Sequence, residues 1–230
     1  MKNKMSELTK ETTQRMFKET GMLISTCEGN ADECARQIVA LESLPKTDEL
    51  NALRGILKTS LMLDFINLDL CTAYRQYLST ELSAKYDKRQ AMTKINVVMS
   101  EGFKKIYGFE SKDDEQRDNS FWRVQIKTTV DYLGKFNEEY NEIEEKLKEI
   151  ANSGVFNRET RNLAVHYDVD PMKVYKMLSE LDGEEVTRRC RDFYTLLNRV
   201  AKFVAQLSCA MASKVSCSSQ IIYSNNPNLR

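Results

Sequence analysis

The chain has 230 residues, of which 41% are hydrophobic and 30% are charged, and its formal net charge is zero. This composition argues against a disordered chain or a membrane protein, and the neutral balance argues against a protein that coats nucleic acid nonspecifically. The 8 glycines and 3 prolines are too few for the frequent turns of an all-β fold. We therefore expect an all-α protein, a helical bundle with long antiparallel helices.

The N-terminal part predicts two helices separated by a break. The first covers about residues 6–26, Gly29-Asn30 interrupts it, and the second continues to Leu44, where Pro45 ends it. Thr47-Asp48-Glu49-Leu50 then has the composition of a helix start, with acidic side chains at the positive end of the helix dipole. Residues 48–107 contain no proline, and apolar residues recur there at steps of three and four, which is typical of a helix.

A single helix over 48–107 would be about 90 Å long, too long for a compact domain. We therefore predict a break near Asp87-Lys88, a second helix to about Tyr107 and a charged loop over 108–119. A long helix is predicted over about 120–152, because apolar residues form a nearly continuous seam along it. Asn152-Ser153-Gly154 ends this helix.

The C-terminal part predicts two further helices after a short one that begins near Asn157. Asp170-Pro171 starts the first of them, which ends near Leu181. Gly183 separates it from the last helix, over about 184–214, whose apolar residues again recur at three and four. We expect residues 1–215 to form one domain and 216–230 to be a frayed tail.

The six cysteines, none in a C-x-x-C pair, are interpreted as buried free thiols in a reducing cytosol. No apolar secretion signal follows the N-terminus, and charged and polar residues interrupt the longest apolar stretch, 57–70. We therefore expect a cytoplasmic protein without a membrane span. The sequence has no pattern for a cofactor loop or for zinc ligands, so neither a cofactor nor a metal is predicted.

The only histidine, His166, lies in the segment Arg161-Asn162-Leu163-Ala164-Val165-His166. Histidine can both accept and donate a proton near neutral pH, so His166 is the first candidate for acid–base chemistry. On a helix, Asn162 and His166 share one face, which Arg158 extends. Arginine is the preferred side chain for holding a phosphate, because its guanidinium group is always charged and can bind two oxygens at once.

This segment resembles the signature of HEPN domains, helical bundles in which arginine, a polar residue and three to five further residues precede a histidine. The resemblance covers about residues 120–214, as a HEPN-like core beside N-terminal helices over 1–107. It implies a metal-independent endoribonuclease with Arg161 and His166 as the catalytic pair and Asn162 in support. Arg158 and Tyr167 are candidate contacts to RNA phosphates. A subgroup of the family has a tyrosine two residues after the histidine, where this chain has Asp168.

The resemblance further implies a homodimer that builds its cleft between subunits, RNA as the substrate, and a toxin or defence role with a protein antitoxin as a partner. An alternative interpretation stays open beside it. Arg161, Asn162 and His166 can also form a polar network that ties a short helix to the bundle. The chain would then be a non-catalytic HEPN-like scaffold that binds a nucleotide or a protein.

Overall fold

The computed structural model describes residues 10–81, 83–108, 119–153, 155–156 and 170–225, with side chains described up to residue 216. Every regular element in these ranges is a helix, so the predicted all-α fold is confirmed. The elements are α1 (Lys10–Glu42), α2 (Asp48–Ser79), α3 (Lys85–Ile106), the π-helix η1 (Trp122–Ile126), α5 (Lys127–Leu133), α6 (Asn137–Asn152), α8 (Pro171–Glu180) and α9 (Gly183–Asn225).

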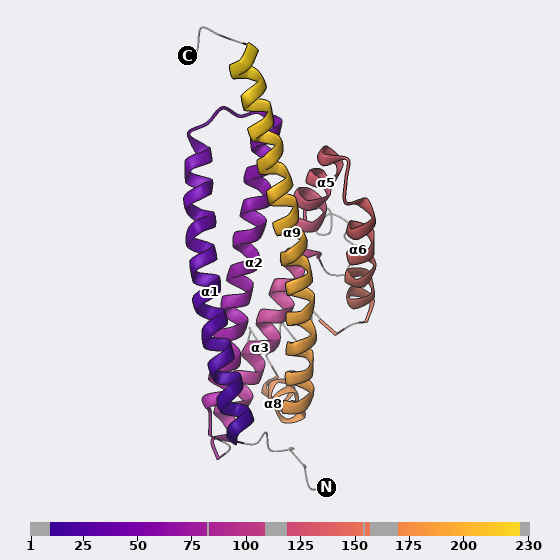
Figure 1. Ribbon diagram of the computed structural model, residues 1–230. Coiled ribbons are helices and arrows are strands. Elements are labelled where there is room, and N and C mark those ends of the chain that lie inside the picture. The colour runs from indigo at the N-terminus through magenta and orange to yellow at the C-terminus, as the bar shows by residue number, and fades with distance from the viewer. Residues whose placement is uncertain (1–9, 82, 109–118, 154, 157–169, 226–230) are drawn as a thin grey trace.

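The long helices α1, α2 and α9 run along the length of the molecule (Figure 1). α1 and α2 are antiparallel neighbours, and α9 packs beside α2 and continues past its end. α3 packs against both α2 and α9, while α5 and α6 form a side lobe next to α9. α2 therefore lies at the centre of the bundle, and this position explains why it is buried on most of its sides.

The predicted break at Gly29-Asn30 is wrong, because α1 is continuous from Lys10 to Glu42. Glycine in a helix interior costs only about 1 kcal/mol relative to alanine. On either side of Gly29 the helix buries Cys27 and Ala31 against the bundle, and this packing along α2 outweighs the local preference for a break. The end of α1 agrees with the prediction, since the helix stops three residues before Pro45.

The predicted start of α2 is confirmed in detail. The Thr47 side chain caps the helix, with its hydroxyl oxygen accepting a hydrogen bond from the Leu50 amide at 3.3 Å. One turn further on, the Arg54 guanidinium donates to the carbonyl oxygens of Leu41, Leu44 and Pro45. Arg54 therefore satisfies carbonyl groups that the end of α1 leaves without helical partners.

The break between α2 and α3 exists but lies several residues earlier than predicted, between Ser79 and Lys85. Lys88, at the position of the predicted break, lies inside α3. Its ammonium group donates to the carbonyl oxygens of Tyr77 at 2.8 Å and Thr80 at 3.2 Å. Lys88 thus binds the C-terminal end of α2 from the neighbouring helix, where a cation is favoured by the helix dipole.

The single long helix predicted over 120–152 is wrong, because the chain turns between Leu133 and Asn137. Gly134 and Phe136 both have left-handed backbone conformations, with φ of 63° and 69°. Glycine tolerates this conformation and commonly follows the end of a helix, but phenylalanine does not favour it. The Phe136 ring packs edge-on against Phe203 of α9, at 6.3 Å between centroids, and this contact helps to offset the backbone cost.

The last helix contains the predicted apolar seam, and every one of its members is buried: Val186, Cys190, Phe193, Leu197, Val200, Val204, Leu207 and Met211. α9 continues to Asn225, past the predicted end at Lys214, and so includes residues 216–225 of the predicted tail. Within the described ranges, none of the helices has an apolar stretch that could span a lipid bilayer.

Candidate functional site

The predicted catalytic and RNA-binding residues lie in one segment of the chain. Arg158, Arg161, Asn162, His166 and Tyr167 all fall within residues 157–169, outside the described residues. The predicted short helix from Asn157 lies outside them as well. The structure does describe the residues that precede and follow this segment, and these flanking residues locate its two ends on the bundle.

Phe156 anchors the N-terminal flank. α6 ends at Asn152, as predicted, and the Ser153 hydroxyl donates to the Ile150 carbonyl oxygen at 2.7 Å. The Phe156 ring then lies against Phe103 of α3 and Phe193 of α9, with centroid distances of 5.0 and 5.5 Å. The last described residue before the candidate segment therefore lies at the junction of α3 and α9.

Asp170 anchors the C-terminal flank. Its carboxylate accepts a hydrogen bond from the Met172 amide at 2.9 Å, and Pro171 is the first residue of α8, as predicted. α8 packs against α3, and Gly183 then begins α9 in close contact with the Tyr77 side chain. Both flanks of the candidate segment therefore rest on the layer of α3 and α9.

A polar cluster centred on Arg123 is linked to the Phe156 anchor through Phe103. Phe103 contacts Tyr107 one helical turn along α3, at 6.1 Å between ring centroids, and Tyr107 shares a hydrogen bond with Arg123. The Arg123 guanidinium lies 3.3 Å from the Glu144 carboxylate of α6. The Lys148 ammonium group also pairs with this carboxylate, at 3.9 Å. Sequence patterns missed this cluster, because it joins three elements that are distant along the chain.

The environment of Arg123 stabilises its positive charge. Burial opposes the charge, but the hydrogen bond with Tyr107 and the negative charge of Glu144 together raise the pKa of Arg123. Burial, followed by the negative charge of Glu144, raises the pKa of Tyr140 in the same cluster. The cluster therefore holds a permanent, partly exposed guanidinium, a group suited to phosphate binding, although Glu144 already occupies part of it.

The four arginines of α9 are engaged in ion pairs along its surface. Arg188 and Arg189 both contact Glu185 at 2.7 Å, and Arg191 lies 3.8 Å from Asp192. Arg199 pairs with Glu142 of α6 at 2.8 Å. These contacts favour a solvated helix surface over a phosphate-binding surface, because each guanidinium group is already paired with a carboxylate.

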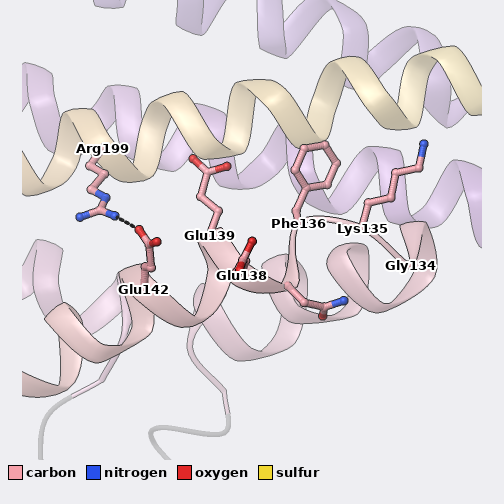
Figure 2. A pocket seen from close by; sticks show the side chains of 8 residues that line it. Gly134, Lys135, Phe136, Glu138, Glu139, Glu142 and Arg199 are labelled. Atoms are coloured by element: carbon pink, nitrogen blue, oxygen red, sulfur yellow. Dashed lines mark hydrogen bonds and ion pairs between the residues drawn. The ribbon is translucent and has the colours of Figure 1, made fainter.

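A groove of about 660 Å³ lies between the start of α6 and α9. Figure 2 shows Lys135 and Glu139 directed toward α9 and the Glu142–Arg199 ion pair at one end of the groove. Its lining combines two cations with three carboxylates, Glu138, Glu139 and Glu142. Carboxylates in the first turn of α6 disfavour a bound phosphate, so we do not assign this groove to RNA.

The described cysteines are free thiols, as predicted, and three of them are buried. Burial raises the pKa of Cys71 to about 11 and that of Cys190 to about 12, so neither is a nucleophile at neutral pH. Among the described residues, no group of three or more His, Cys, Asp or Glu side chains is arranged to hold a metal ion. Trp122 is fully buried and packs in the core rather than forming a platform for bases.

Comparisons with known proteins assign no relative. No family model matches the chain, and no curated protein and no solved structure matches it.

Proposed function

We propose that this protein is a metal-independent endoribonuclease of the HEPN type, with Arg161, Asn162 and His166 at its catalytic site. The observation that carries the proposal is the segment Arg161-Asn162-Leu163-Ala164-Val165-His166 within an all-α chain. The flanking anchors support it, because Phe156 and α8 on either side of the segment pack on the layer of α3 and α9.

The proposed reaction is an internal transesterification of RNA. The 2′-hydroxyl oxygen forms a bond to the adjacent phosphorus while the bond from phosphorus to the 5′ oxygen breaks. His166 takes the proton of the 2′-hydroxyl, and the 5′ oxygen gains a proton as it leaves. Arg161 stabilises the charge that develops on the phosphoryl oxygens, and Asn162 orients the imidazole or the phosphate. The products are a cyclic phosphate end and a 5′-hydroxyl end.

The proposed enzyme acts in the cytoplasm as a homodimer with a protein partner. Two copies of the chain form the cleft, Arg158 and Tyr167 contact the RNA, and a protein antitoxin restrains the activity. With a net charge of zero, the enzyme would depend on a local site rather than on a broad basic surface to bind RNA. A narrow range of RNA targets would follow from this charge balance.

The test is cleavage of a mixed RNA pool in the presence of EDTA. Wild type should cleave and leave cyclic phosphate ends, while His166→Ala should lose about 10²-fold or more of the rate. Arg36→Ala is a control, because Arg36 is exposed on α1 and pairs only within its helix, with Glu33. All variants must first show equal thermal stability. No cleavage by well-folded wild type across the pool would overturn the endoribonuclease proposal.

The exposed face of α8 favours a second candidate function, a binding protein for a protein partner. Met172 and Tyr175 lie one turn apart on α8 and are 64% and 62% exposed. Methionine and tyrosine are enriched at protein interfaces, where they anchor a partner. If this candidate is correct, Met172→Ser with Tyr175→Ser should abolish complex formation with a copurified partner. Tyr86→Ser, at a comparably exposed tyrosine on α3, should leave it unchanged.

A further inference from the structure

The surface that joins α1 to α2 differs from the rest of the core. The buried side chains of the described part of α1 are small or of medium size: Thr20, Cys27, Ala31 and Ile38. Large aromatic and aliphatic side chains fill the layers among α2, α3 and α9 instead. With less apolar area to bury, the attachment of α1 depends more on the polar groups within its interface.

Asp64 is one of these polar groups, a carboxyl group on the α1 side of α2. It is only 9% exposed, and Asn30 of α1 donates a hydrogen bond to it. Among the described residues, no lysine or arginine forms an ion pair with Asp64. A buried carboxylate without a cation is costly, so the neutral form of this group is favoured.

Asn67 lies one turn further along α2, and its side-chain oxygen lacks a hydrogen-bond donor among the described residues. The residue is 6% exposed, and this oxygen is buried. Residues three apart on a helix are neighbours on its surface. An ionised carboxylate can only accept hydrogen bonds, whereas a protonated carboxyl group can donate one. A protonated Asp64 is therefore a candidate donor to the Asn67 oxygen on the same side of α2.

The titratable groups that the structure describes around Asp64 are thiols and one carboxylate, and none of them brings a positive charge that would offset its burial. From α1, the Cys27 and Cys34 thiols approach it, and Glu33 adds a negative charge near Cys34. Cys71 of α2 lies beside Cys27, and Cys190 of α9 lies beside Cys71. Burial raises the pKa of Asp64 to about 6, against the opposing effect of the Asn30 hydrogen bond.

We propose that Asp64 is a proton-operated latch that holds α1 on α2. In the neutral state, Asp64 accepts the hydrogen bond from Asn30, donates its proton to the Asn67 side-chain oxygen and closes the interface. In the ionised state, the interface contains an unpaired charge beside an unpaired amide oxygen, and α1 is held less tightly. Acidification therefore strengthens the attachment of the N-terminal helix.

The sign of this pH dependence follows from the pKa of Asp64 in the folded and unfolded states. The pKa of Asp64 is about 6 in the folded chain and has an ordinary value of 3.8, so the folded state binds the proton more tightly than the unfolded state. The stabilisation is fully present below about pH 4 and is lost as the pH rises through about 6. Hydrogen exchange of the α1 amides, corrected for the intrinsic effect of pH, measures this attachment directly.

The test compares protection factors over residues 28–38 of α1 at pH 5 and pH 7.5 in the full chain. In wild type they should fall by roughly threefold or more as the pH rises. Asp64→Asn mimics the neutral carboxyl group and should keep the protection factors high at both pH values. Asp69→Asn, at an exposed carboxyl group of the same helix, should behave as wild type.

Asn30→Ala provides a second test if Asp64→Asn fails to fold. It removes the hydrogen bond that stabilises the ionised form, so the loss of protection should begin at a higher pH than in wild type. Protection that is independent of pH in wild type would overturn the latch, as would the same pH dependence in Asp64→Asn as in wild type. An unchanged pH midpoint in Asn30→Ala would count against it in the same way.

Discussion

Trp122 stacks on Tyr140 with ring centroids 4.8 Å apart and an angle of 15° between the ring planes. The two residues belong to η1 and α6, which a single straight helix would hold far apart. The contact exists because the chain reverses at Gly134–Phe136, and both rings are buried, with Phe203 of α9 beside Trp122. This aromatic stack fixes the side lobe on the bundle.

Loss of the Tyr140 ring should therefore destabilise the protein strongly. Tyr140→Ala should lower the free energy of unfolding by about 3 kcal/mol or more, because it removes a large buried aromatic side chain. Tyr140→Phe keeps the ring and should cost far less. Urea unfolding followed by circular dichroism measures both changes, and Tyr86→Ala serves as a control at an exposed tyrosine. Equal losses for the alanine and phenylalanine variants would argue against the stack.

Arg54 should stabilise the connection between α1 and α2. Arg54→Ala removes the donors to the carbonyl groups of Leu41 and Leu44 and should cost about 1–2 kcal/mol in the free energy of unfolding. Arg54→Lys keeps one charge but not the planar group, so it should recover only part of this loss. Thermal unfolding measures both changes, and Lys58→Ala, at an exposed residue one turn further along α2, should have little effect in it.

Alanine should have opposite effects at two glycines. Gly134 has a φ of 63°, so Gly134→Ala should destabilise the protein by about 1 kcal/mol, although the position has open space. Gly29 lies inside α1 with no atom near an added side chain, so Gly29→Ala should stabilise by about 0.5–1 kcal/mol. Melting temperatures of the two variants should shift in opposite directions, and a shift in the same direction would contradict the backbone assignment.

The Phe156 anchor should matter for the proposed activity. Phe156→Ala removes the contacts with Phe103 and Phe193, so the chain that leads to Arg161 and His166 should lose its anchor on the bundle. RNA cleavage should fall by about tenfold or more in a protein that still folds, because catalysis is sensitive to small displacements. Val155→Ala, at the neighbouring exposed residue, should retain activity. Full activity of Phe156→Ala would show that this anchor does not position the segment.

Local chemistry made several parts of the fold predictable from the sequence. Thr47 and Asp170 cap α2 and α8 because their side chains bond to amides two or three residues away. The seam of α9 was predictable for a similar reason, since its spacing repeats along one helix face and needs no knowledge of what it packs against. The Arg161–His166 segment was likewise identified from neighbouring residues alone, as a catalytic hypothesis.

The arrangement of the helices depended on contacts between distant residues. The turn at Phe136 is supported by the ring of Phe203, which lies in a different helix. The apolar spacing of residues 126–150 continues through the turn without marking it. α1 passes through Gly29 because α2 packs along it. In the same way, the Arg123 cluster draws on three elements, and no periodicity in one segment reveals it.

By itself, the sequence determined the all-α class, the helix caps and the apolar face of α9, because each follows from interactions within about one or two helical turns. Only the tertiary structure decided where α5 reverses into α6 and which helices surround Asp64. Burial of a side chain depends on the whole bundle. In the sequence, Asp64 only interrupts an apolar stretch, whereas in the bundle its burial raises its pKa.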